Sequence, residues 1–400
     1  MENVYTSLSA NYTVENEEFY KNGNKLVNEE GTPISKIDFK MMVKKETSSF
    51  IHRNFSNIIV LVGAGASVVS KGGDIDERFG KTVSMLASLI KQELDEHSEY
   101  FTLQELADLC KYSVSVEKTE GGKIVLNPQF NLEDFISDLQ SFEKYVSEDK
   151  RDKYIESKSK IFELIKTNTS YEYDDKCLNH SAFINTVSHL VKAPSKLTIV
   201  TTNYDTLIED AADSIGYTVM DGFTFSHRPF FDSDMFEWNL VKDIENVKTR
   251  EHEYKKNILN LLKIHGSLTW EREGEKIRRK EKDEVTEPIM IFPSSNKYMQ
   301  SYQNPYFELF TKFQELLKRP NTLLITTGFS FADNHISQMI IQAIKHNKSL
   351  AALISDYNIE QDNPNWRGLV DLMNKNYQIA FLKATMNDDL TGYVGEYYDN

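Results

Sequence analysis

Residues 57–67 read NIIVLVGAGAS, and they decide the fold class. The first six residues form a short apolar run rich in β-branched side chains, which is typical of a strand buried in a parallel sheet. The turn GAGAS at 63–67 follows at once. Its missing side chains let backbone N–H groups approach a phosphate, and the N-terminus of a following helix adds favourable charge. A tight turn without a ligand explains the same residues, and the third glycine of the dehydrogenase fingerprint is missing.

Buried strands and helices alternate along much of the chain. Polar or glycine-bearing segments follow several of the strands. This alternation predicts an α/β fold with a doubly wound, mainly parallel (Rossmann-like) sheet, in which ligands bind outside the carboxyl ends of the strands. Strands are predicted at 57–62, 196–202, 259–265, 288–292, 323–331, 352–358 and 377–383. Helices are predicted at 80–96, at 335–346 and at 367–374, and a further helix follows residue 205 and ends at 212.

Two regions depart from this alternation. Residues 101–194 show helical spacing of apolar side chains around 103–109, 132–139, 155–165 and 182–191, with a turn at 121–122. This spacing predicts a mostly helical insertion. Residues 1–45 are polar with weak alternation, and we expect an N-terminal extension that forms a short hairpin or an assembly arm. Residues 46–400 are then one domain that carries the insertion.

Charge and composition argue against several classes of protein. The net charge of −15 argues against direct binding of nucleic acid. The sequence has no run of 18 or more apolar residues, so no membrane span is predicted. The acidic N-terminal residues lack the apolar segment of a secretory signal, and a cytoplasmic location is therefore expected. Cys110 and Cys177 lie far apart, which predicts no thiolate zinc site and favours two free thiols over a single disulfide. The mixed-sign stretch EREGEKIRRKEKD at 271–283 favours a solvated hairpin or loop over a partner-docking site.

A polar motif, TTNYD at 201–205, closes the second long strand of this pattern. Asn203 offers both a donor and an acceptor, which suits orienting a ribose hydroxyl or a water molecule. The carboxylate of Asp205 can accept a hydrogen bond from an amide. The alternative is that Asn203 or Asp205 only caps the following helix.

Two further strand ends carry candidate residues. His265 begins the motif HGS, and a histidine at a strand end can act as a base near neutral pH, although a half-buried, hydrogen-bonded histidine is the alternative. In TGFSFAD at 327–333, the small residues Gly328 and Ser330 permit close approach to a phosphate or ribose. Asp333 is predicted to cap the helix that begins near His335.

Taken in order, the motifs GAGAS, TTNYD, HG and GFSF resemble the sirtuin-like family of NAD-binding proteins, over residues 50–100 and 195–360. The resemblance implies a sirtuin-like NAD-binding domain over 46–400. It also implies a role for each matching residue. Asn203 would place the attacking water by the nicotinamide ribose, and His265 would be the general base. The NAD-binding set would be Gly63, Ala64, Gly65 and Ser67 at the phosphates, Asp205 at the nicotinamide carboxamide, Gly328 and Ser330 at the adenosine side, and Asp356 at the adenine ribose. Thr202 would also belong to the NAD-binding set.

Departures from the deacylating sirtuins are equally informative. Residues 268–322 hold no cysteine, so the four-cysteine zinc module is missing and no metal is expected. Residues 68–82 lack the Phe-Arg pair, because Arg78 and Phe79 stand in reverse order. An acyl-lysine site is therefore not expected.

The stretches GFSFADNHI and PSSNKY…NPYF resemble the bacterial branch of the family, in which the domain is often an NAD-hydrolysing effector of antiphage defence. The size resembles that of the subunit that pairs with a HerA-type ATPase and forms homo-oligomers. This resemblance implies an NAD glycohydrolase with NAD as substrate. The alternatives are a non-catalytic sensor of NAD or ADP-ribose that regulates a partner ATPase, a zinc-free deacylase, and a structural subunit with a vestigial site.

Overall fold

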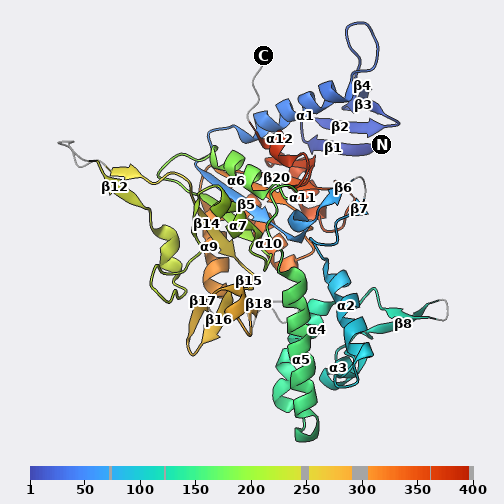
Figure 1. Ribbon diagram of the computed structural model, residues 1–400. Helices are drawn as coiled ribbons and strands as arrows, with labels where there is room; N and C mark the ends of the chain where they lie inside the picture. Colours follow the sequence, from blue (N-terminus) through green and yellow to red (C-terminus); the bar gives the residue numbers. More distant parts are fainter. Residues whose placement is uncertain (72–73, 121–122, 245–251, 291–304, 361, 396–400) are drawn as a thin grey trace.

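A computed structural model describes residues 1–71, 74–120, 123–244, 252–290, 305–360 and 362–395 (Figure 1). An eleven-stranded sheet runs through the molecule in the order β11-β14-β10-β5-β19-β20-β21-β1-β2-β3-β4. The first seven strands in this order run parallel to one another. The predicted α/β class with a mainly parallel, Rossmann-like sheet is confirmed. These strands are β11 (Thr218–Met220), β14 (Ile258–Lys263), β10 (Leu197–Thr201), β5 (Asn57–Val62), β19 (Thr322–Thr327), β20 (Leu350–Asp356) and β21 (Ile379–Lys383).

The topology changes direction at β5. From β5 the chain first adds β10 and β14 on one side, and it later returns to add β19, β20 and β21 on the other. Val62 pairs with Thr201 of β10 and with Thr327 of β19, so the three strands end level with one another. Such a switch point leaves a crevice at the carboxyl ends of the strands, where ligands bind in open α/β sheets.

Each face of the sheet has its own apolar core. Val60 and Leu323 pack with α1 (Lys36–Ile51), α6 (His180–Ser188), α7 (Leu207–Ser214) and α12 (Leu390–Val394). Their neighbours Leu61 and Leu324 pack with α9 (Tyr306–Lys318), α10 (Asn334–His346) and α11 (Arg367–Asn374) on the opposite face. Both faces are covered, which explains why the central strands are continuously apolar.

The first 45 residues extend the sheet. β1 (Glu2–Ser7), β2 (Asn11–Glu15), β3 (Glu18–Lys21) and β4 (Asn24–Lys25) are antiparallel, and β1 joins β21 through the pair Tyr5 and Leu382. Tyr5 and Tyr12 are buried, and Phe39 of α1 meets Tyr12 edge to face. This region therefore forms strands of the main sheet (Figure 1). Its use in assembly stays a prediction.

A helical lobe lies below the sheet in Figure 1. It contains α2 (Val83–Glu96), α3 (Leu103–Cys110), α4 (Leu132–Phe142), α5 (Glu148–Thr169) and the hairpin of β8 (Glu117–Glu120) and β9 (Lys123–Leu126). Ile90, Leu106, Phe135 and Ile161 share its separate core. The lobe thus begins with α2, earlier than the predicted insertion at 101–194, and α6 packs on the sheet instead. The predicted turn at 121–122 lies outside the described residues.

Two predictions near the β14 end had different outcomes. The stretch at 271–283 does form a hairpin, of β16 (Trp270–Glu273) and β17 (Lys276–Arg279), in which Glu273 pairs with Arg228 and Arg278. The strand predicted at 288–292 is not part of the main sheet. Its described part, β18 (Ile289–Met290), pairs antiparallel with β15 (Gly266–Ser267), and residues 291–292 lie outside the described residues.

The remaining strands form two small hairpins, β6 (Ser70–Lys71) with β7 (Asp74–Ile75) and β12 (Val241–Asp243) with β13 (His252–Tyr254). Within the described ranges, no helix has the length and apolar character that crossing a membrane requires.

Candidate active site

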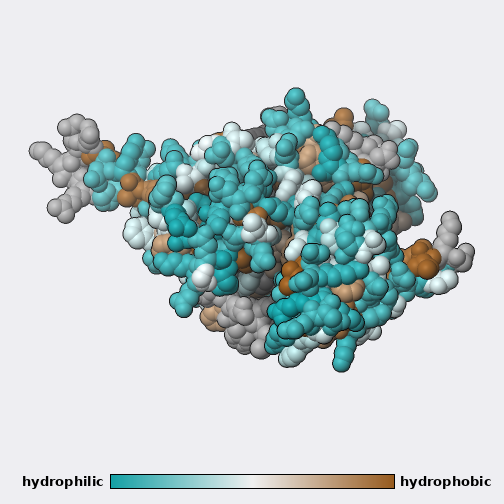
Figure 2. Space-filling view, turned by 60° about the horizontal axis from the view of Figure 1, so that its bottom comes forward, coloured by the Kyte–Doolittle hydropathy of each residue, from teal (hydrophilic) through white to brown (hydrophobic). Residues whose placement is uncertain are grey.

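A pocket of about 380 Å³ opens at the carboxyl ends of the four central strands. Figure 2 shows the surface hollowed between the helical lobe and the part of the molecule that carries β16 and β17. Residues of the sheet side and of the helical lobe line it together. Eight residues predicted from the sequence are among the lining: Ala64, Ser67, Thr202, Asn203, Asp205, His265, Gly328 and Ser330.

The glycines of the turn after β5 are explained by a neighbouring loop. Gly328 follows β19 with a φ of +63°, and a Cβ added there would lie 2.1 Å from the nitrogen of Ala66. A Cβ on Gly63 would lie 2.5 Å from the carbonyl oxygen of Gly328. The amide of Gly65 donates to that oxygen at 2.9 Å. The two backbones therefore interlock behind the pocket, and only glycine fits both the contact and the left-handed φ.

The backbone contact between these two loops uses amides of the glycine turn that the resemblance to the sirtuin-like family would assign to the NAD phosphates. The Gly63 amide donates to Thr327 at 3.0 Å, and the Ala66 amide donates to Gly63 at 3.0 Å. The turn continues as a short 3₁₀ helix (Ala64–Ser67), and α2 starts only at Val83. This start agrees with the helix predicted at 80–96, and because the segment 68–82 intervenes, the N-terminus of α2 does not follow the glycine turn directly. A phosphate bound at this turn would compete with the backbone bonds.

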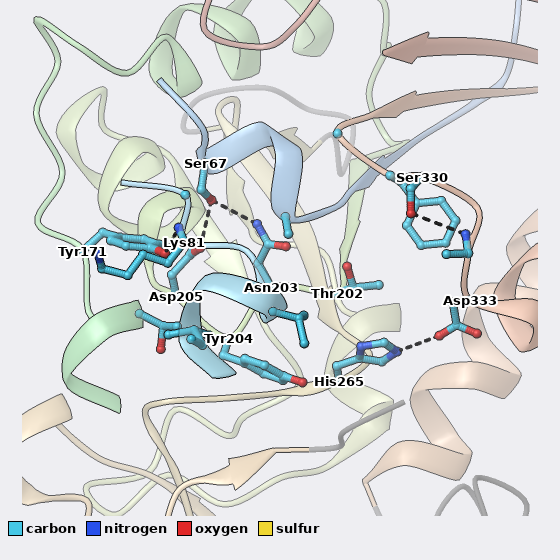
Figure 3. A pocket seen from close by; sticks show the side chains of 18 of the residues that line it. Ser67, Lys81, Tyr171, Thr202, Asn203, Tyr204, Asp205, His265, Ser330 and Asp333 are labelled. Carbon is cyan, nitrogen blue, oxygen red and sulfur yellow. Dashed lines mark hydrogen bonds and ion pairs between the residues drawn. The ribbon is translucent and has the colours of Figure 1, made fainter. Parts of the chain in front are cut away.

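Asn203 is held by a buried hydrogen-bond network. Its Nδ2 donates to the carbonyl of Gly63 at 3.2 Å and to Oγ of Ser67 at 3.1 Å. Ser67 in turn donates to Oδ2 of Asp205 at 3.0 Å. Figure 3 shows these three side chains meeting on one side of the pocket. The network fixes the side-chain amide of Asn203, as orienting a ligand or water requires.

Asp205 lies two residues before helix α7 and belongs to this network. Its Oδ1 accepts from the amide of Leu207 at the start of α7, at 3.1 Å. Burial raises the pKa of the Asp205 carboxyl, and the positive charge of Lys263 partly opposes that shift. Lys263 is itself buried, and its Nζ donates to the backbone carbonyl of Asp205 and to Oε1 of Glu209 at 2.8 Å. The N-cap of α7 is Thr206 and no side chain caps it, so neither Asn203 nor Asp205 is a simple helix cap.

His265 follows β14 and is buried against a carboxylate. Its Nε2 lies 3.4 Å from Oδ2 of Asp333. The other oxygen of Asp333 accepts from the amides of His335 at 2.9 Å and Ile336 at 3.2 Å. The predicted helix cap at Asp333 is confirmed. Its contact with His265 was not foreseen, because a capping pattern carries no information about a strand some 70 residues earlier.

Further lining residues come from the helical lobe and its connections, and they too were missed. The hydroxyl of Tyr171, just after α5, accepts from the amide of Lys81 at 2.9 Å. Burial raises the pKa of Tyr171 to about 12, and the nearby Asp205 adds to the shift. Val83 and Leu86 of α2 contribute an apolar wall. The apolar spacing within one helix shows that the helix has a buried face. It does not show which distant strands the helix will lie against.

Asp356 is not among the residues that line this pocket. It ends β20, two strands from β5, and its Oδ1 accepts from the amide of Asn358 at 3.3 Å. Burial raises the pKa of its carboxyl. Gly63 and Gly65 also lie behind the lining rather than on it. For metals, the described residues contain no group of three or more His, Cys, Asp or Glu side chains that could hold an ion.

One family model matches part of the chain. Residues 197–379 match the family model of the SIR2-like domain. The matched range carries TTNYD, HGS and GFSF, and it begins after GAGAS. A solved structure described as the structural basis for the mechanism and regulation of Sir2 enzymes aligns with 10% sequence identity and a TM-score of 0.39, covering 88% of this chain and 95% of that one. No curated protein matches the chain. The match over 197–379 supports an NAD-related function.

Proposed function

We propose that this chain is an NAD glycohydrolase, which cleaves the nicotinamide–ribose bond of NAD to give nicotinamide and ADP-ribose. The observation that carries the proposal is that Asn203 and His265, from different strand ends, line one pocket within a SIR2-like match. A polar residue that can orient water and a residue that can accept a proton are the two groups this hydrolysis needs.

The reaction is balanced without protonation of the leaving group. Water oxygen bonds to C1′ of the ribose while the C1′–nitrogen bond breaks, and that electron pair returns to the nicotinamide ring, which leaves as a neutral molecule. The proton lost by the water passes to His265 and then to solvent. An ordinary glycosidase uses two carboxylates, one of which must protonate the leaving group. The proposed roles of Asn203 and His265 therefore suffice.

The other pocket residues would hold the substrate. Asp205 lies beside Asn203 and would contact the nicotinamide carboxamide, while Gly328 and Ser330 would lie at the adenosine side. Val83 and Leu86 would limit the entry of bulk water from the helical lobe. Residues 268–322 hold no cysteine for the zinc module of the deacylases, and this departure in the sequence favours hydrolysis over deacylation.

The test measures nicotinamide and ADP-ribose released from NAD by the wild type, Asn203→Ala and His265→Ala. Removal of a general base lowers turnover by about 10²–10⁴-fold, so His265→Ala should be nearly silent while it still binds NAD in calorimetry. His346→Ala and Asn365→Ala replace exposed residues of the same types and should keep wild-type rates. Wild-type binding without any release would contradict the proposal and favour the sensor alternative.

A role in antiphage defence, as a homo-oligomer that pairs with a HerA-type ATPase, rests on the sequence resemblance. The same assay with and without a candidate ATPase, together with the mass of the particle in solution, tests it. Faster NAD cleavage in the mixture would support control by the partner. Identical rates and a monomeric mass would contradict it.

A further inference from the structure

We infer that Asp333 is a positioning residue for His265, whose carboxylate orients the imidazole and stabilises its protonated form. This inference rests on the proposed function. Oδ2 of Asp333 lies 3.4 Å from Nε2 of His265, and the two side chains are only 7% and 6% exposed (Figure 3). At that distance and depth, an opposite charge strongly favours the charged form of an imidazole.

The position of the Asp333 carboxylate is fixed from two directions. Oδ1 accepts from two consecutive amides of α10, those of His335 and Ile336, which locks the carboxylate plane at the helix end. Ser337 adds a second constraint, because its amide donates to the Asp333 carbonyl at 2.9 Å and its hydroxyl to the Phe331 carbonyl at 2.8 Å. Oδ2 is thereby held toward His265.

The loop that delivers Asp333 is strained. Phe331 is buried and has a φ of +60°, in the left-handed region that a residue with a side chain rarely adopts. Its ring packs edge to face on Phe329 at a centroid distance of 4.9 Å. Strain of this kind persists only where the surroundings impose it, and it gathers at functional sites. Here it lets the chain turn from β19 into α10 within reach of His265.

The charges around His265 favour this role for Asp333. The other titratable side chains that line the pocket are Lys81, Tyr171, Tyr204 and Asp205. Asp205 is in the Ser67 and Asn203 network, and Tyr171 accepts from the Lys81 amide. A proton taken up by His265 during hydrolysis would therefore be compensated at the imidazole by the Asp333 carboxylate.

The competing interpretation is that Asp333 only caps α10. Asp333→Asn and Asp333→Ser separate the two roles, because Asn and Ser cap helices about as well as Asp but carry no charge. We expect both variants to keep the wild-type melting temperature and NAD affinity while kcat falls about tenfold or more, since a charge this close shifts a pKa by about 1–3 units. Asp232→Asn, at the cap of the 3₁₀ helix (Ser233–Glu237), is the matched control and should keep the wild-type kcat.

A second measurement does not depend on turnover. Titration of the histidine ring signals by NMR, with His265 assigned from the signal lost in His265→Ala, should show the pKa of His265 lowered by about one unit or more in Asp333→Asn. Wild-type kcat together with an unchanged His265 pKa in that variant would overturn the inference. If the wild type releases no nicotinamide, the proposed function fails, and the titration alone still decides whether Asp333 controls His265.

Discussion

Gly328 carries the most demanding backbone geometry of the site. Alanine there would meet both a left-handed φ and a 2.1 Å contact with the Ala66 nitrogen. We expect Gly328→Ala to lower the free energy of unfolding by about 2 kcal/mol or more, because strain of this kind costs about 1–3 kcal/mol before any clash is counted. Gly392→Ala, where an added Cβ meets nothing within 4 Å, should change it by less than about 1 kcal/mol. Denaturant unfolding of both variants checks this, and equal losses would contradict the interlock.

Asp205 should make stability depend on pH. Its raised pKa means that the folded chain holds this proton more tightly than the unfolded chain. The stability contribution is therefore full below about pH 4, the ordinary carboxyl value, and is lost as pH rises through the raised pKa. Asp205→Asn removes the ionisable group, so its stability relative to the wild type should grow from pH 4 to 8 in urea unfolding. Exposed Asp213→Asn is the control, and a flat difference for Asp205→Asn would contradict the shift.

For single residues of the site, the identity of a residue could be predicted from the sequence, but its contacts could not. Asn203 and His265 could be predicted because each directly follows an apolar strand, and parallel strands end on the same edge. The interlock of Gly63 and Gly65 with Gly328 could not, since close backbone packing and phosphate binding select the same residue type. The contact between His265 and Asp333 depends on the path of the loop after β19, which local patterns leave undetermined.

Among the elements, β14 connects His265 to the loop that carries Asn203 and Asp205, and Lys263 makes this connection. This lysine stands two residues before His265, and its ammonium holds the carbonyl of Asp205 in the β10–α7 loop. Lys263→Met should lower the free energy of unfolding by about 2 kcal/mol or more, because Glu209 loses its buried partner. It should also lower kcat, since the loop that carries Asn203 loses its anchor.

Two comparisons isolate the Lys263 effect. Adding Glu209→Gln to Lys263→Met should recover part of the stability without restoring kcat. Lys196→Met, which removes a donor to the Phe236 carbonyl away from the pocket, should affect stability alone. Wild-type kcat in Lys263→Met would contradict the anchoring role.

Element boundaries were predicted best where both faces of the element are buried. β5 was predicted at its observed bounds because it is apolar throughout and a turn ends it. The periodicity of α2 correctly indicated a buried face. A periodic pattern does not show which core that face joins, so the helical lobe was predicted to begin at residue 101 instead of at α2. The strand predicted at 288–292 could not be placed outside the main sheet from its sequence, because a short apolar run does not show which strand it pairs with.

Across the whole molecule, the pocket has one wall from the sheet and one from the helical lobe. A ligand in the pocket should therefore tie the lobe to the sheet. We expect saturating NAD to slow amide hydrogen exchange at the start of α2 and the end of α5, where Val83, Leu86 and Thr169 line the pocket. β1 to β3, at the far edge of the sheet, provide the internal reference and should be unchanged. Protection confined to the strand ends would contradict a shared site.

The seam between β1 and β21 has a consequence for the order of folding. Tyr5 and Leu382, which pair across it, are separated by almost the entire chain. Closing so long a loop costs conformational entropy before any contact is gained, and contacts of this kind slow folding. The N-terminal meander can form its own hairpins early, but it can dock only onto a parallel sheet that already presents β21. Until then β21 is an open edge, ready to accept a strand from any neighbouring chain.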